Sequence, residues 1–428
     1  MEILLSISIS LIAGLFVSRI TRRFGLPDVT AYLIAGILVG PFCLGLIGVE
    51  GLGFTSLEKV ESLSLISNVA LGFIAFAMGN EFRLSQLKAI GKQATVVAVF
   101  QAITATVFVD AALIALHFVI PEELPLEAAI TLGAIATATA PAATLMVVRQ
   151  YKAKGPLTDI LLPVVALDDA VGLVVFAISF GIAESLTSGT ISVIGTVVEP
   201  LIEIFASLLL GFVMGQLFTF SERFFHSNSK RLSISITYVF LTVALSMIEF
   251  KIGPVEVGFS PLLVCMMLGT VFCNECDFSE ELMERCDKWT HPLFVLFFVI
   301  SGAELELNVL AKAAVVGIGV VYILSRCAGK YFGARISSGF MGCSPTIRKY
   351  LGITLFPQAG VALGMTITAQ TLTGCGSLIR NIVLFSVLVY EIVGPALTKM
   401  SLKKAGEISP RPDYVPNKAK TEIRPNAK

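Results

Sequence analysis

Apolar stretches long enough to cross a lipid bilayer recur thirteen times along this chain of 428 residues. Only helices and closed barrels satisfy their backbone hydrogen bonds inside a membrane, and a spanning helix needs about 20 apolar residues. Just 14% of the residues are charged, whereas soluble domains carry about a quarter. We therefore expect an all-α polytopic membrane protein with about 13 transmembrane helices. The predicted spans are residues 3–19, 29–48, 62–79, 93–119, 127–148, 157–184, 192–220, 232–249, 257–273, 291–303, 309–335, 350–372 and 379–398.

Basic residues are unevenly divided between the two sides of these helices. Of the 31 Lys and Arg residues, 25 fall in alternate loops and the C-terminal tail, and four fall in the opposite loops. Loops rich in Lys and Arg stay in the cytoplasm. The N-terminus is therefore predicted outside and the C-terminus inside. The tail, residues 401–428, contains four prolines and is predicted to be disordered and cytoplasmic.

Asp168 and Asp169 are adjacent in the middle of the predicted span 157–184, which is otherwise almost wholly apolar. An ionised carboxylate at this depth costs several kcal/mol unless it is paired, hydrated or protonated, and such residues mark ion and proton pathways. We interpret the pair as a site for a cation or a proton. An intramembrane aspartyl protease also needs two carboxylates, but on two facing helices, whereas adjacent residues of one helix point about 100° apart. An enzyme is therefore not indicated.

Arg326 and Lys330 lie within the eleventh predicted span, one turn apart on one helical face. Either can neutralise a buried aspartate. Counted at ~1.5 Å per residue, Asp168 lies ~16 Å from the cytoplasmic start of its helix, and Arg326 lies ~15 Å from an expected helix end near Ile336. Lys330 is one turn shallower and can extend towards the cytoplasm. Depth therefore favours Arg326 as the partner of Asp168, with Lys330 as the alternative.

The fifth and twelfth spans each contain a proline near the middle. Such a proline removes one backbone donor and disturbs the preceding turn. An ordinary kink explains either one alone. The two spans correspond, however, if helices 1–6 and 8–13 form inverted repeats around the seventh, and paired broken helices in matching halves indicate a transport site. The residues predicted to lie at these unwound segments are Thr137, Thr139, Pro141, Phe356, Pro357 and Gln358.

Together these motifs resemble the cation:proton antiporter superfamily, and more narrowly the thirteen-helix bacterial sodium/proton antiporters with an Asp-Asp motif. Residues 22–27 (RRFGLP) and 35–41 (AGILVGP) are also similar to the second branch of that superfamily. The likeness covers about residues 1–400. It implies an antiporter domain with two crossing broken helices, a core of residues 93–184 and 309–398, and remaining helices that form a dimerisation panel in a homodimer of the inner membrane.

The resemblance also implies roles for the charged residues. Asp169 would alternately bind the cation and the proton, and Asp168 would pair with the basic residue of the eleventh helix. Electrogenic members usually have a lysine at that position, and an arginine does not lose its proton. The preference for Arg326 therefore conflicts with a mechanism that deprotonates the basic partner.

The expected function is secondary active exchange of a monovalent cation for protons by alternating access. Na⁺ is the expected cation, with K⁺ or Li⁺ as alternatives. A sodium-coupled symporter of an organic anion on a related fold is a further alternative. No cofactor or nucleic acid is indicated, and the partners are the two ions and the lipid bilayer. A zinc site at Cys273, Cys276 and Cys286 would lack an obvious fourth ligand, so no metal is expected beyond the transported ion.

Overall fold

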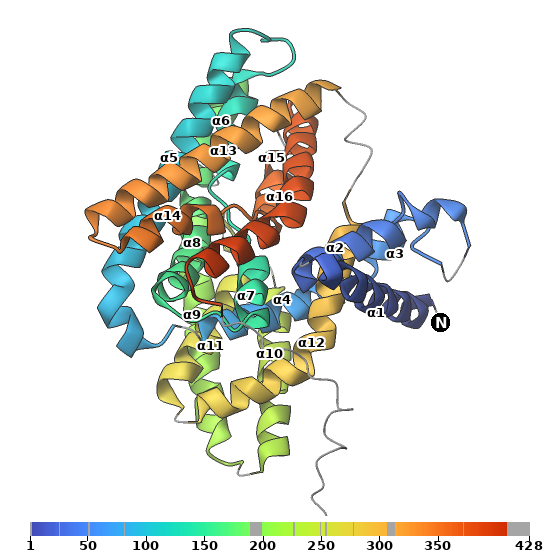
Figure 1. Cartoon of the computed structure of the whole chain (residues 1–428), viewed down its shortest axis with the longest axis vertical. Helices are drawn as coiled ribbons and strands as arrows, with labels where there is room; N and C mark the ends of the chain where they lie inside the picture. Colours follow the sequence, from blue (N-terminus) through green and yellow to red (C-terminus); the bar gives the residue numbers. More distant parts are fainter. Residues whose placement is uncertain are drawn as a thin grey trace, which may run out of the picture.

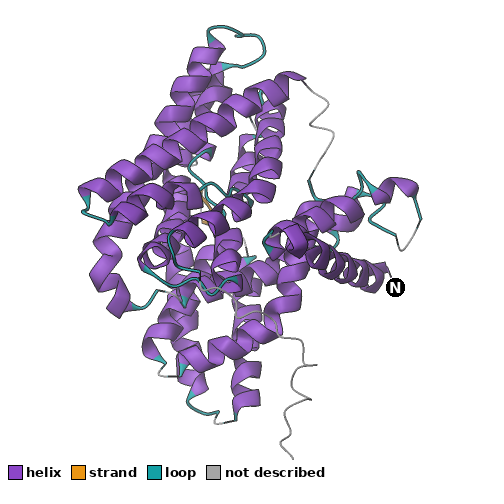
Figure 2. Ribbon diagram, in the orientation of Figure 1, coloured by secondary structure: helices purple, strands orange, loops and turns teal. Residues whose placement is uncertain are grey.

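The structure is a computed structural model. It describes residues 2–408 except 25, 50–51, 81, 189–198, 226, 249, 253–254, 277, 306–312 and 371. Figures 1 and 2 show that the described chain is almost entirely helical. Its one sheet is a small antiparallel hairpin of β1 (Phe250–Ile252) and β2 (Val255–Val257). The tail predicted to be disordered begins at residue 401. This prediction is wrong for residues 401–404, which continue the last helix, and for residues 405–408, which are ordered against the start of another helix, while residues from 409 onward lie outside the described part.

Every predicted span of the first half corresponds to a helix or a broken helix. Prolines occupy the first position of α7 and α8, where a backbone N–H would have no hydrogen-bond acceptor within the helix. Short segments at helix ends are η1 (Arg22–Phe24), η2 (Leu44–Ile47) and α3 (Leu57–Glu61). The main helices are α1 (Glu2–Thr21), α2 (Asp28–Val39), α4 (Ser64–Gly79), α5 (Leu84–His117), α6 (Leu126–Ile135), α7 (Pro141–Gln150) and α8 (Pro156–Ser188).

The second half follows the same pattern after a seventh spanning helix. Ser260 and Ser344 cap the next helices by accepting hydrogen bonds from backbone N–H groups three residues later, and a proline follows each serine. The helices are α9 (Glu199–Glu222), α10 (Asn228–Ser246), α11 (Pro261–Glu275), α12 (Ser279–Ala303), α13 (Ala313–Phe340), α14 (Pro345–Thr354), α15 (Gly360–Ala369) and α16 (Gly376–Lys404). The predicted domain boundary at residue 400 therefore falls inside α16.

Within the described residues, seven helical segments are long and apolar enough to cross a membrane by themselves. They are α1, α2 together with the following η2, α5, α8, α9, α13 and α16. The helices α4, α6 and α11 are apolar but shorter. The predicted thirteen spans are completed by α10, α12 and the broken pairs α6–α7 and α14–α15. The predicted fold class is thus confirmed.

The two broken helices meet at their breaks, as predicted. The chain is non-helical between Ile135 and Pro141 and again between Thr354 and Gly360. The Ala140 N–H donates to the Pro357 carbonyl at 2.8 Å, which joins one break directly to the other. Backbone groups released by the breaks therefore satisfy each other inside the protein, as a membrane interior requires.

The helix contacts show the inverted repeat. If α1–α8 is one repeat and α10–α16 the other, α2 corresponds to α11 and α4 to α12. The contact between α2 and α12 then has its counterpart between α11 and α4, and the contact of α5 with α8 has its counterpart between α13 and α16. The equivalent helices α5 and α13 lie against each other, as Figure 1 shows. This arrangement puts α8 and α13, which carry the predicted charged residues, beside the crossed breaks.

Candidate functional site

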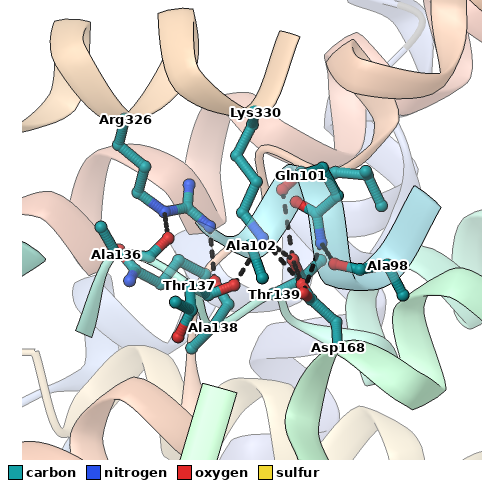
Figure 3. A network of polar contacts seen from close by, with 12 residues as sticks. Ala98, Gln101, Ala102, Ala136, Thr137, Ala138, Thr139, Asp168, Arg326 and Lys330 are labelled. Atoms are coloured by element: carbon teal, nitrogen blue, oxygen red, sulfur yellow. Dashed lines mark hydrogen bonds and ion pairs between the residues drawn. The ribbon is translucent and has the colours of Figure 1, made fainter. Parts of the chain in front are cut away.

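Asp168 on α8 is fully buried and is hydrogen-bonded on both carboxylate oxygens. Oδ1 accepts a hydrogen bond from the Gln101 side chain of α5, and Oδ2 accepts one from the Thr139 hydroxyl. Lys330 Nζ of α13 lies 2.7 Å from Oδ2 and forms an ion pair with it. Figure 3 shows these groups converging on Asp168 from two other helices and one break. The charge of Asp168 is thus fully matched.

Lys330 is itself completely buried, and its ammonium group has three acceptors. Besides Asp168, it donates to the Thr137 carbonyl and, at 3.0 Å, to the Thr139 hydroxyl. Thr137 and Thr139 lie in the break between α6 and α7, so Lys330 links α13, α8 and the unwound segment. A lysine ammonium has three donors, and all three have an acceptor here.

The predicted pairing of Arg326 with Asp168 is wrong, and so is the expectation that Lys330 extends towards the cytoplasm. The reason is the length of α13, which continues to Phe340 rather than ending near Ile336. Lys330 therefore lies ten residues, ~15 Å, and Arg326 fourteen residues, ~21 Å, from the C-terminal end of α13. Asp168 lies twelve residues from Pro156 at the start of α8, midway between these two values, so depth does not favour Arg326, and the contacts select Lys330.

Arg326 instead binds the backbone of both breaks. Its guanidinium donates to the carbonyls of Ala136 at 2.9 Å and Ala138 at 2.5 Å, and to that of Phe356 at 2.8 Å. It also lies 4.6 Å from the centre of the Tyr390 ring. The side chain replaces the N–H donors that a continuous helix would supply to these carbonyls. Arg326 therefore holds the two crossed segments together, and Figure 3 shows its hydrogen bonds to Ala136 and Ala138 of the first break.

Gln358 supports the same crossing from the second break. Its amide donates to the Ile135 carbonyl at 2.9 Å and to the Tyr322 hydroxyl at 3.0 Å. Pro141 starts α7 at its first position, and the Pro357 carbonyl accepts from Ala140. The structure thus brings every predicted residue of the two unwound segments to the crossing.

Asp169 differs from its neighbour in one respect. It is 2% exposed, yet among the described residues neither of its carboxylate oxygens has a hydrogen-bond partner. Gly172, one turn further along α8, lies against the Thr137 hydroxyl, since a Cβ at Gly172 would come within 2.8 Å of that oxygen. A buried carboxylate without a partner is costly and needs a proton or a cation.

A cavity of ≈ 730 Å³ opens beside the first half of α8. Leu162 and Pro163 of α8 line it, as do Arg149 of α7 and Asp287 of α12, which form an ion pair across it. Asp169 lies six residues, ~9 Å, beyond Pro163 on the same helix. The described lining of the cavity on α8 thus ends before the two aspartates.

Three buried polar residues of the site were not identified from the sequence. Gln101 donates a hydrogen bond to Asp168, and Tyr322 accepts one from Gln358. The Tyr390 ring lies under the Arg326 guanidinium. A glutamine in the middle of an apolar span is a usable signal, because an amide in the membrane interior needs partners. The two tyrosines could not have been identified as site residues from the sequence, since tyrosine is common in membrane helices.

Comparison with known proteins agrees with this geometry. The family model described as "Sodium/hydrogen exchanger, transmembrane" matches residues 7–404. The Na(+)/H(+) antiporter NhaS4 of Synechocystis sp. is 24% identical over 363 residues, covering 82% of this chain and 85% of its own. The high-affinity Na(+)/H(+) antiporter NhaS3 of the same organism is 23% identical over 393 residues, covering 84% and 81%.

The fold is also found in a solved structure. The sodium proton antiporter MjNhaP1 from Methanocaldococcus jannaschii matches with a TM-score of 0.74 at 16% identity, over 95% of this chain and 98% of the other. At this identity the match shows the fold alone. The family model covers nearly all of the described chain, and this protein therefore belongs to the sodium/hydrogen exchanger family of transmembrane proteins.

Proposed function

We propose that this protein exchanges Na⁺ for protons across the membrane by alternating access, and that Asp169 binds both ions in turn. The observation that carries the proposal is the contrast between the two aspartates. Asp168 has its charge matched by Lys330, whereas the buried Asp169 carboxylate has no hydrogen-bond partner among the described residues. The names of the relatives, which are Na⁺/H⁺ antiporters, support the same exchange.

The chemistry follows from competition for one carboxylate. A buried aspartate beside another aspartate favours its neutral, protonated form. A monovalent cation can displace the proton because it balances the same charge. Neighbouring oxygen atoms from the break, such as the Thr137 hydroxyl, are suitable ligands for a hard cation. Proton and cation therefore exclude each other, which is the requirement for antiport.

Lys330 gives the cycle a second proton carrier. Unlike arginine, a desolvated lysine can lose its proton, and cation binding next to Asp168 weakens the attraction that keeps Lys330 charged. If both Lys330 and Asp169 exchange a proton for each Na⁺, the cycle moves net charge. We therefore propose an electrogenic exchange of two protons for one Na⁺.

The orientation and the domain arrangement belong to the same proposal. We infer that the cavity beside α8 faces the cytoplasm, because its walls include Arg83, Arg149, Lys152 and Lys154 from basic loops. The N-terminus then lies outside an inner membrane and the tail inside. The core is α5–α8 with α13–α16, the remaining helices are the dimerisation panel, and two copies form a homodimer.

Transport in vesicles tests the function. The purified protein is reconstituted into liposomes with an imposed pH gradient, and proton movement is followed after addition of Na⁺, Li⁺ or K⁺. We expect Na⁺ and Li⁺ to dissipate the gradient and K⁺ to have little effect. A response to K⁺ alone would replace the proposal by K⁺/H⁺ exchange, and a response to no cation would contradict it.

A further inference from the structure

A second hollow, of ≈ 910 Å³, lies away from the aspartates, between the end of α13 and the start of α14. Its walls carry three basic side chains, Arg335 from α13 and Arg348 and Lys349 from α14, and none of the described residues that line it is acidic. These bases flank the α13–α14 connection, which the charge distribution assigns to the cytoplasm. Figure 1 shows α13 and α14 meeting at the edge of the molecule. The hollow thus lies at the border between membrane and cytoplasm.

In the part of the chain that the structure describes, no carboxylate neutralises the positive charge of this hollow. Among the described residues, none of the three bases forms an ion pair with a carboxylate. Arg335 donates to the Tyr331 hydroxyl at 2.9 Å, and Lys349 lies 5.3 Å from the centre of the Tyr350 ring. Arg348 lies over Gly339, where a Cβ would come within 3.4 Å of its guanidinium. The described contacts of each base are thus with uncharged groups, so all three positive charges can interact with a bound anion.

The rim of the same hollow is apolar and exposed. Phe340 is 79% exposed, and Phe332 and Ile336 are each nearly half exposed. Phe332 stacks on Phe108 of α5 with ring centroids 6.1 Å apart, so the apolar surface continues onto α5 and along the membrane-facing side. Basic residues beside an apolar surface that reaches into the bilayer fit a ligand with an anionic head and hydrocarbon chains.

We propose that this hollow binds an anionic phospholipid, with its phosphate between Arg335, Arg348 and Lys349 and its acyl chains along the α13–α5 surface. Guanidinium groups suit this task because they form paired hydrogen bonds to phosphate oxygens. A soluble anion would use the bases but not the aromatic rim. The ligand is therefore a membrane lipid rather than free phosphate.

The lipid would contact the helix that carries the ion-pair lysine. Lys330 is one residue before Tyr331, which lines the hollow. Gly352 of α14 packs on the backbone of Lys330 and Tyr331, where an added Cβ would come within 2.6 Å of the Tyr331 Cα. The α14 helix then leads into the second break. Lipid binding should therefore stabilise α13 against α14 and the crossing that follows.

The test uses the full-length protein in nanodiscs of phosphatidylcholine with or without phosphatidylglycerol. Thermal unfolding is measured for the wild type and for the triple variant Arg335→Gln/Arg348→Gln/Lys349→Gln. A matched control removes three bases at the end of α1, Arg19→Gln/Arg22→Gln/Arg23→Gln. Phosphatidylglycerol should raise the melting temperature of the wild type and the control, and should have much less effect on the triple variant. Equal responses of the two variants would overturn the proposal.

Two further arms identify the ligand and guard against misfolding. Soluble glycerophosphate, added to protein in phosphatidylcholine, should not reproduce the stabilisation, and an equal effect would contradict a lipid ligand. A photoreactive phosphatidylglycerol should label peptides of α13 and α14 in the wild-type protein, which needs no variant to fold. Labelling confined to other helices would also refute the site.

Discussion

Lys330 Nζ lies 2.7 Å from Asp168 Oδ2, and both side chains are fully buried. This pair ties the helix of the two aspartates to the crossed segments through Thr137 and Thr139. It also leaves Asp169 as the neighbouring buried carboxylate that has no hydrogen-bond partner among the described residues, which is why we propose that the exchanged ions bind there.

The ion pair should show strong coupling in a double-mutant cycle. Lys330→Ala leaves Asp168 buried without its counter-charge, and breaking such a pair costs about 3–5 kcal/mol in soluble proteins. Adding Asp168→Asn should restore much of the stability, because no orphan charge remains. Thermal unfolding of the three variants in detergent measures the coupling. Additive effects would show that the two residues do not form a pair.

Arg326 should behave differently, because its partners are backbone carbonyls. Arg326→Gln removes charge-assisted hydrogen bonds worth about 1.5–3 kcal/mol each, so the melting temperature should fall. Asp168→Asn should not rescue this variant, unlike Lys330→Ala. Rescue by Asp168→Asn in the same unfolding experiment would return Arg326 to the role of ion-pair partner.

The contrast between these two residues shows how far the sequence can be interpreted. The thirteen spans, both breaks and the aspartate pair could be predicted from hydropathy, proline positions and intramembrane charge. The partner of Asp168 could not, because α13 ends one turn later than expected, and with that end Arg326 and Lys330 differ equally in depth from Asp168. The role of Arg326 depends on where the breaks place their carbonyls, which is a tertiary feature.

The segment after α16 should contribute to stability. The Glu407 carboxylate accepts hydrogen bonds from the backbone N–H groups of Leu157 at 2.6 Å and Thr158 at 2.8 Å, at the start of α8. Glu407→Ala should cost about 0.5–2 kcal/mol, as loss of a helix cap does. Truncation after residue 408 should keep this stability, whereas truncation after Lys404 should lose it. Equal melting temperatures of the two truncations would contradict the capping role.

The apparent affinity for Na⁺ should fall as the pH falls. Under the proposal, protons and Na⁺ compete for Asp169, so below the pH at which this site takes up its proton the apparent KM should rise about tenfold per pH unit for each competing proton. The maximal rate at saturating Na⁺ should change much less. Initial rates in liposomes at several pH values separate the two quantities. An apparent KM independent of pH would exclude competition for a shared site.

Lys330 should determine the charge moved per cycle. Lys330→Gln keeps a hydrogen-bond donor beside Asp168 but removes the second proton carrier. If the variant still transports, exchange should become electroneutral and insensitive to an imposed membrane potential, whereas the wild type responds to it. Asp168→Asn/Lys330→Gln serves as the second variant, since it has no orphan charge. A wild type that does not respond to the potential would contradict two-proton exchange.

The most direct test of the account is transport by Asp169→Asn. This substitution keeps the shape of the side chain and removes the charge that Na⁺ and protons are proposed to share. The variant should fold, with a melting temperature at least equal to that of the wild type, because an unpartnered buried carboxylate has been neutralised. In liposomes with an imposed pH gradient, Na⁺ should then cause no proton movement. Na⁺-dependent proton movement at the wild-type rate would contradict the assignment of Asp169 as the exchange site.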